Sequence, residues 1–111
     1  MGTFTKGDIV LFPFPYTDLT NRKLRPCLII SNEMGEDIIL CQITSQRIRK
    51  DKYCVDIKQN NTIDGSLQID SCIRTNMIFT ANRVQILKKL CMIKDEQYNE
   101  VVNIINNLIR K

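Results

Sequence analysis

Residues 7–31 of the chain are GDIVLFPFPYTDLTNRKLRPCLIIS, and this stretch decides the fold class. Residues 8–14 are β-branched and aromatic, which is typical of a strand. Pro13 and Pro15 are expected to end this strand, because proline cannot donate to a ladder. Residues 25–31 are a second apolar run, separated from the first by a polar loop. The stretch therefore predicts two strands joined by a loop.

More short strands are expected on the C-terminal side of this pair. Residues 37–44 (DIILCQIT) follow an NEMG turn and predict a third strand, antiparallel to the second. The remaining segments predict a strand at 53–57, a turn at 59–66 around Asp64-Gly65, one or two strands within 67–79, a helical turn at 80–83 capped by Thr80, and a strand at 86–93. Five to seven short strands close most economically as a small barrel.

One helix is expected, at the C-terminal end of the sequence. Its apolar residues repeat at helical spacing: Tyr98, Val101, Val102, Ile105, Leu108 and Ile109. Asp95 is the expected N-cap, and Arg110 and Lys111 suit the last turn. The sequence thus predicts a single domain over residues 1–111, mainly β with a C-terminal α-helix.

Composition excludes several kinds of site. The 111 residues include no histidine, so no side chain titrates near neutrality without perturbation. The five cysteines lack CxxC spacing and are expected to be reduced, mostly buried and not metal ligands. The sequence has no phosphate-binding loop and no serine nucleophile motif. No metal and no cofactor are expected.

The first residues of the sequence are polar, and no apolar run is long enough to span a membrane. A cytoplasmic protein without a membrane segment is therefore expected.

Basic residues gather in a few segments of a chain with net charge +4. These residues are Arg22, Lys23 and Arg25, then Arg47, Arg49, Lys50 and Lys52, then Arg83, Lys88, Lys89 and Lys94. Such fields favour a phosphate-rich partner, although a solvated charged surface gives the same pattern.

Two residues stand out at the strand ends. Arg25 is expected to start the second strand, and Thr44 ends the third. Both are almost equidistant from the turn between these strands, so antiparallel pairing brings them together. A guanidinium can bind phosphate oxygens, and a neighbouring hydroxyl can donate to the same oxygens. The alternative is a surface arginine beside Pro26 and an ordinary β-forming threonine.

Four blocks of the sequence resemble the MazF/PemK toxin family. They are residues 7–31, ILCQITSQ at 39–46, DSCIRTNMIFTANRVQILKKLCMI at 70–93 and the terminal KDEQYNEVVNIINNLIR. The resemblance implies an SH3-like barrel that forms a homodimer. It also implies a toxin of a type II toxin–antitoxin system that cleaves single-stranded RNA, leaving a 2′,3′-cyclic phosphate and a 5′-hydroxyl.

The resemblance also implies roles for particular residues. Arg25 and Thr44 match the family's catalytic arginine and threonine. Arg25 is expected to stabilise charge and to take part in proton transfer to the leaving 5′-oxygen, and Thr44 to orient the phosphate. No side chain is assigned to deprotonating the 2′-hydroxyl. The expected RNA-binding residues are Tyr16, Thr17, Ser45, Arg47, Arg49, Lys50 and Arg74. The expected partners are single-stranded RNA and an antitoxin with an acidic or amphipathic tail, with DNA reached only through the antitoxin.

Two other functions remain open at this point. Toxins of the CcdB type share the barrel but bind DNA gyrase without catalysis, and a barrel can also bind RNA or a peptide without cutting it. The expected loss of cleavage on replacing Arg25 with alanine separates these alternatives from a nuclease.

Overall fold

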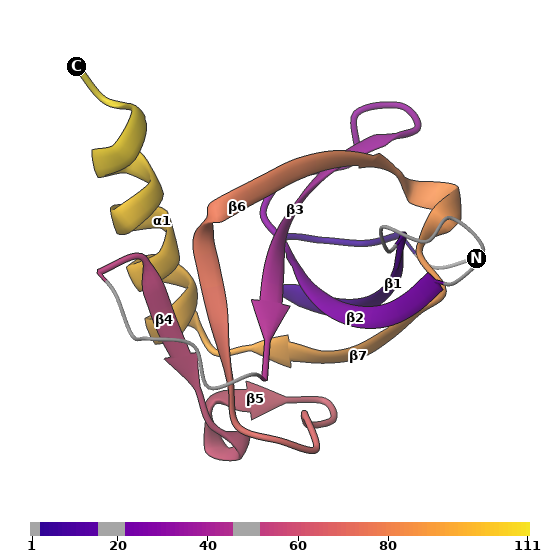
Figure 1. Cartoon of the computed structure of the whole chain (residues 1–111), viewed down its shortest axis with the longest axis horizontal. Helices are drawn as coiled ribbons and strands as arrows, with labels where there is room; N and C mark the ends of the chain where they lie inside the picture. Colours follow the sequence, from indigo (N-terminus) through magenta and orange to yellow (C-terminus); the bar gives the residue numbers. More distant parts are fainter. Residues whose placement is uncertain (1–2, 16–21, 46–51) are drawn as a thin grey trace.

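The chain folds into a nearly closed antiparallel barrel with a helix beside it, as predicted (Figure 1). The computed structural model describes residues 3–15, 22–45 and 52–111, with the side chains of Pro15 and Arg22 left out. Within these ranges the strands are β1 (Asp8–Pro15), β2 (Arg22–Ile29), β3 (Asp37–Thr44), β4 (Cys54–Ile57), β5 (Thr62–Ile63), β6 (Ser71–Asn82) and β7 (Lys88–Ile93). Two 3₁₀ turns, η1 (Gln59–Asn61) and η2 (Arg83–Gln85), and helix α1 (Asp95–Ile109) complete the described elements.

The described strands form one sheet in the order β4-β6-β3-β2-β1-β7-β5. β1, β2 and β3 make the predicted antiparallel meander, and the long β6 returns alongside β3. β4 pairs only with β6 in the described sheet and is therefore an edge strand. None of the described helices is long and apolar enough to cross a membrane.

The sheet buries apolar side chains on both faces, which explains its nearly continuous apolar strands. We call one set the Phe12 core: Val10, Phe12, Cys27, Ile29, Ile38, Leu40, Ala81 and Ile86. We call the other the Val101 core: Ile9, Leu28, Cys41, Ile43, Val55, Ile57, Leu67, Ile73, Cys91, Ile93 and Val101. Alternate residues of β1, β2 and β3 belong to opposite cores. This alternation decides which face each polar side chain occupies.

The ends of the first two strands differ from expectation. β1 runs through Pro13 to Pro15 instead of ending at the prolines, because past Leu11 it pairs with β2 and no longer with β7. A proline on such a one-sided stretch does not have to supply a ladder bond on the other side. β2 begins at Arg22, so Arg25 lies inside the strand rather than at its start.

β6 also differs from expectation, since it continues to Asn82 where a helical turn was predicted. The turn η2 starts at Arg83, and the side chain of Asn82, not Thr80, caps it by accepting from the Val84 amide. Earlier in β6, residues 74–77 face the single residue Gln42 of β3, which makes a wide irregularity in the ladder. Such an insertion bends the strand and lets it follow the curve of the barrel.

Helix α1 packs against the Val101 core beside β4 and β6, as Figure 1 also shows. Val101 is fully buried, with Tyr98, Ile104 and Ile105 partly buried around it. The predicted apolar stripe was partly wrong. It included Val102, Leu108 and Ile109, which are exposed, and it left out Ile104, which packs against the core. The predicted ends were also wrong. Lys94 is the N-cap and makes no side-chain cap, and Arg110 is the C-cap rather than part of the last turn.

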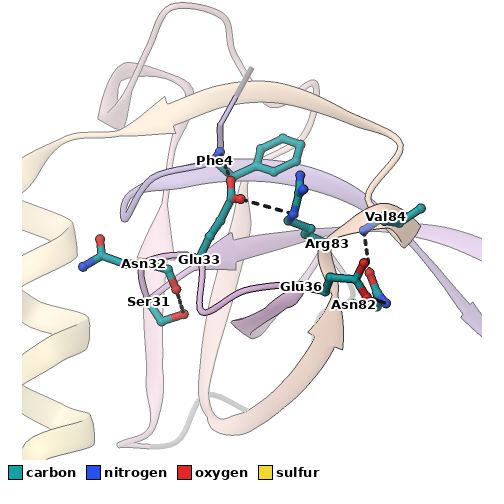
Figure 2. A network of polar contacts seen from close by, with 8 residues as sticks. All are labelled: Phe4, Ser31, Asn32, Glu33, Glu36, Asn82, Arg83 and Val84. Atoms are coloured by element: carbon teal, nitrogen blue, oxygen red, sulfur yellow. Dashed lines mark hydrogen bonds and ion pairs between the residues drawn. The ribbon is translucent and has the colours of Figure 1, made fainter. Parts of the chain in front are cut away.

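A polar network closes the end of the barrel at the β2–β3 turn (Figure 2). The Glu33 carboxylate accepts the Phe4 amide at 2.7 Å and lies 3.3 Å from Nε of Arg83. Glu36 receives the Arg83 amide on its backbone oxygen at 2.8 Å. The network joins the N-terminal segment, the turn and η2, at the opposite end of β2 and β3 from Arg25 and Thr44.

Replacing Glu33 with alanine is expected to lower the free energy of unfolding by about 1–2 kcal/mol, because a charge-assisted amide bond and an ion pair are both lost. Urea denaturation measures the change. Glu36→Ala is the matched control: this exposed side chain has a long 3.5 Å contact with Asn82, and its removal is expected to cost less than about 0.5 kcal/mol. Equal losses in the two variants would contradict the role given to Glu33.

Candidate active site

The pairing of β2 with β3 brings Arg25 and Thr44 to the same end of the sheet. Cys27 lies opposite Gln42, and Leu28 lies opposite Cys41. Carrying this register two residues further places Arg25 opposite Thr44, as the spacing from the turn predicted. Residues that face each other in an antiparallel ladder share one face. Both side chains therefore belong to the face of the Phe12 core.

An aromatic cluster borders Arg25 on this face. Phe12 lies opposite Arg25 in the β1–β2 ladder and is buried, while Arg25 itself is partly buried. The rings of Phe12, Phe14 and Phe79 form three mutual contacts with centroids 5.3–5.4 Å apart. Packed rings beside the strand hold the backbone of Arg25 against a rigid core, which limits the positions open to its guanidinium.

Thr44 is held from the other side by β6. It lies opposite Cys72 and is only 4% exposed. Cys72 lies in turn opposite Asp56 of β4, so a threonine, a cysteine and a carboxylate follow one another across three strands on one face. Burial raises the pKa of the Cys72 thiol to about 12, so this cysteine is neutral at physiological pH.

Arg74, a predicted RNA-binding residue, lies on the same face. It is two residues from Cys72 along β6, so the two side chains share a face, and it lies opposite Cys54 in the ladder with β4. Its positive charge lies near enough to Cys72 to oppose, without cancelling, the effect of burial on the thiol pKa. The Nε atom of Arg74 is buried and has no hydrogen-bond partner among the described residues. Arg25 and Arg74 thus lie on opposite flanks of Thr44.

Ser45 occupies a different environment. It lines a pocket of about 490 Å³, whose lining includes the apolar residues Leu11, Leu24, Pro26, Leu67 and Leu90 as well as polar residues. Leu24 and Pro26 are the immediate neighbours of Arg25 on β2, so their side chains point to the face opposite that of Arg25. The pocket therefore lies on that opposite face of the sheet. The structure therefore separates Ser45 from Arg25 and Thr44, although the three share one end of the barrel.

Five of the predicted RNA-binding residues lie outside the described residues: Tyr16, Thr17, Arg47, Arg49 and Lys50. Their roles stay predictions. The prediction missed Cys72, which the fold places opposite Thr44, and Cys54 and Asp56, which lie one strand further away on β4. The alternation YCVDI in residues 53–57 indicated which of these side chains share a face, but it did not indicate the neighbouring strand.

The arrangement suits an anionic ligand with tetrahedral oxygens. Two guanidinium groups flank a buried hydroxyl, and a guanidinium can donate two parallel hydrogen bonds to a phosphate. Within the residues that the structure describes, no three histidine, cysteine or acidic side chains cluster as metal ligands would. The groups that face this end can bind a phosphodiester and stabilise negative charge as it develops.

A family model provides the identification. The model of the PemK-like, MazF-like toxin of type II toxin-antitoxin systems matches residues 5–109. The chain belongs to this family. Comparison with the curated proteins finds no match. The MazF-like family match includes every strand described above and all of α1, which agrees with a single structural unit.

Solved structures have the same fold at low sequence identity. A MazE-MazF crystal structure from Deinococcus radiodurans aligns with a TM-score of 0.79 and 15% identity, covering 97% of each chain. A mycobacterial endoribonuclease aligns with a TM-score of 0.72 and 16% identity, covering 96% of this chain and 91% of the other. A mycobacterial endoribonuclease in complex with its cognate antitoxin aligns at 0.73 and 14%, covering 96% and 93%. At these identities the likeness shows the MazF-like fold.

Proposed function

We propose that this MazF-like toxin is an endoribonuclease that cuts single-stranded RNA with Arg25 and Thr44. The observation that carries the proposal is the register of β2 against β3, which, carried two residues beyond Cys27 and Gln42, brings an arginine opposite a buried threonine at one end of the barrel. The family match and the solved mycobacterial endoribonucleases of the same fold support it. The match to a MazF-like model over residues 5–109 also favours this function over gyrase binding of the CcdB type.

The proposed chemistry uses the nucleophile that RNA already carries. The 2′-oxygen attacks the adjacent phosphorus, and the bond from phosphorus to the 5′-oxygen breaks. The products are a 2′,3′-cyclic phosphate and a 5′-hydroxyl: the 2′-hydroxyl loses one proton as its oxygen bonds to phosphorus, and the leaving 5′-oxygen gains one. Arg25 stabilises the negative charge that grows on the phosphate oxygens, and Thr44 holds one of these oxygens in place. The role of Arg25 is charge stabilisation, because a free guanidinium does not lose its proton near neutrality.

The RNA strand is proposed to cross the face that carries Arg25, Thr44 and Arg74. Arg74 binds a neighbouring phosphate, and Arg47, Arg49 and Lys50 follow the backbone further along. Tyr16 and Thr17, which follow β1 in the sequence, contact bases. Ser45 lies on the opposite face and contacts a base that passes over the shared end of the barrel. Because these contacts are largely ionic, RNA binding is expected to weaken as salt is raised.

The proposed assembly is a homodimer in the cytoplasm that a cognate antitoxin neutralises. The solved structures of the same fold include a MazE-MazF crystal structure and an endoribonuclease with its cognate antitoxin. An acidic or amphipathic antitoxin tail would compete with RNA for the basic face, and the antitoxin would provide any contact with DNA.

Cleavage without added metal is the first expected result. Purified protein in excess EDTA should cut a long, weakly structured RNA at discrete sites and leave 2′,3′-cyclic phosphate ends, which end-specific ligation and mass spectrometry identify.

Thr44→Val keeps the size of the side chain but removes the hydroxyl. It is expected to slow cleavage about tenfold to a hundredfold, since one hydrogen bond to a charged group is lost.

Thermal unfolding provides the control for this variant, because Thr44 is buried and its replacement must leave the fold intact. Intact RNA with folded wild-type protein, over a range of salt and temperature, would overturn the nuclease proposal. Cleavage that starts only when a divalent metal is added would overturn its metal independence.

A further inference from the structure

Two cysteines from different strands meet beside the candidate site. The Sγ atom of Cys72 in β6 donates a hydrogen bond to Sγ of Cys54 in β4, at 3.4 Å. Both side chains are partly exposed, so a small oxidant can reach them. The two residues are 18 positions apart in the chain, and only the β4–β6 ladder brings them together.

The other three cysteines differ from this pair. Cys27, Cys41 and Cys91 are fully buried within the two cores. Burial raises the pKa of Cys27 and Cys41 to about 12, and the Cys41 thiol donates to the backbone oxygen of Arg74. Their full burial puts these three thiols out of reach of solutes, which is what separates them from the partly exposed Cys54 and Cys72. The five cysteines therefore divide into one accessible pair and three inert core residues.

We infer that Cys54 and Cys72 form a reversible intramolecular disulfide when the protein meets a hydroperoxide. A disulfide needs its sulfur atoms about 2.05 Å apart, so the pair must approach by roughly 1.3 Å. β4 has only four residues and is hydrogen-bonded in the described sheet to β6 alone. An edge strand held on one side can move by this distance without disturbing a second ladder.

The reaction balances with one hydroperoxide. Cys54 accepts the hydrogen bond, so its sulfur is the one that attacks: the O–O bond of hydrogen peroxide breaks, one oxygen leaves as water, and Cys54 becomes a sulfenic acid. The Cys72 sulfur then attacks the Cys54 sulfur. The S–S bond forms, the S–O bond breaks, and a second water leaves with the Cys72 proton. Two thiols lose two electrons in total, and one peroxide becomes two waters.

The disulfide would also reach the candidate active site. Cys72 lies directly opposite Thr44, and residues that face each other in a ladder share one face, so forming the bond draws the Cys72 sulfur toward β4 and changes the packing against the threonine. A misplacement of about 1 Å in a catalytic group can slow a reaction by up to about a hundredfold. Resting on the proposed function, the expected consequence is that oxidation slows RNA cleavage by about tenfold or more.

Thiol mapping tests the disulfide without any assay of function. The full-length protein is treated with hydrogen peroxide or with dithiothreitol, free thiols are alkylated, and peptides are analysed by mass spectrometry. Peroxide should produce a Cys54–Cys72 linked peptide in the wild type and in Cys91→Ala, and dithiothreitol should remove it. Cys54→Ser should give no linked peptide. Five alkylated thiols after peroxide, a link to another cysteine, or a link between two chains would each overturn the inference.

Cleavage assays on the same samples test the coupling. The oxidised wild type should cut RNA at least about tenfold more slowly than the reduced protein and recover with dithiothreitol. Cys54→Ser should cut equally well with and without peroxide. A disulfide that forms while cleavage stays unchanged would overturn the coupling. If the reduced protein does not cut RNA, the proposed function fails and the coupling fails with it, while the thiol map still decides the disulfide.

Discussion

Arg25→Ala is expected to lower the rate of RNA cleavage by about a thousandfold or more, because arginines that stabilise charge in phosphoryl transfer contribute factors of this size. The structure supports a large effect, since Arg25 lies opposite Phe12 in the ladder and, by register, opposite the buried Thr44. The measurement is the single-turnover rate on a short RNA that contains one mapped cleavage site. Single turnover separates the chemical step from product release.

Two variants make this result specific. Arg25→Lys keeps the charge but loses the planar fork, and its cleavage should stay well below that of the wild type. Lys23→Ala removes a neighbouring charge from the same face of β2, where the exposed Lys23 lies opposite Phe14. It should weaken RNA binding modestly and leave the single-turnover rate at saturation close to normal. A fully active Arg25→Ala variant would remove Arg25 from the mechanism.

Gly65→Ala is expected to lower the free energy of unfolding by about 3 kcal/mol or more, through backbone strain and steric overlap together. Gly65 has φ of +131°, which residues with a side chain rarely adopt, and it follows Asp64 at φ of +55°. A Cβ atom at Gly65 would overlap the backbone oxygen of Leu90 and lie 3.2 Å from Cβ of Cys91. Relief requires the turn to move away from β7, which opens the Val101 core near Leu67. Urea denaturation followed by circular dichroism measures the loss.

Gly35→Ala is the matched control for this effect. Gly35 also has a positive φ, +67°, but an added Cβ there would have no atom within 4 Å. Its replacement is expected to cost about 1 kcal/mol, the ordinary cost of the left-handed conformation for an alanine. Equal losses in the two glycine variants would show that the close approach of the turn to β7 does not contribute to the free energy of unfolding.

Local sequence was informative where each segment carries its own signal. The bounds of β3 match the prediction, since residues 37–44 lie between a turn and a polar segment and are apolar almost throughout. The Asp64-Gly65 turn is present, with both residues at positive φ. The β2–β3 register followed from the distance of Arg25 and Thr44 to one turn, which is a local property of a hairpin.

Predictions that depended on partners were less accurate. Whether Pro13 ends β1 depends on β7, which lies 75 residues away in the chain and stops pairing after Leu11. Which helix residues are buried depends on the position of the Val101 core, and this position left Val102 exposed and covered Ile104. The buried face of α1 could not be deduced from helical spacing, because several neighbouring stripes on this helix are apolar enough to pack.

The sequence by itself determined the β-barrel class, the single helix, the order of the first three strands and the candidate pair Arg25 and Thr44, because propensity, turn chemistry and hairpin register act over short distances in the chain. Only the tertiary structure decided that Cys72 lies opposite Thr44, that Arg74 and Cys54 face each other on the next two strands, and that Ser45 lines another pocket. These positions follow from the pairing of β6 with β3 and β4, between segments that are far apart in the chain. Such pairing depends on how the whole sheet closes, and no local pattern specifies it.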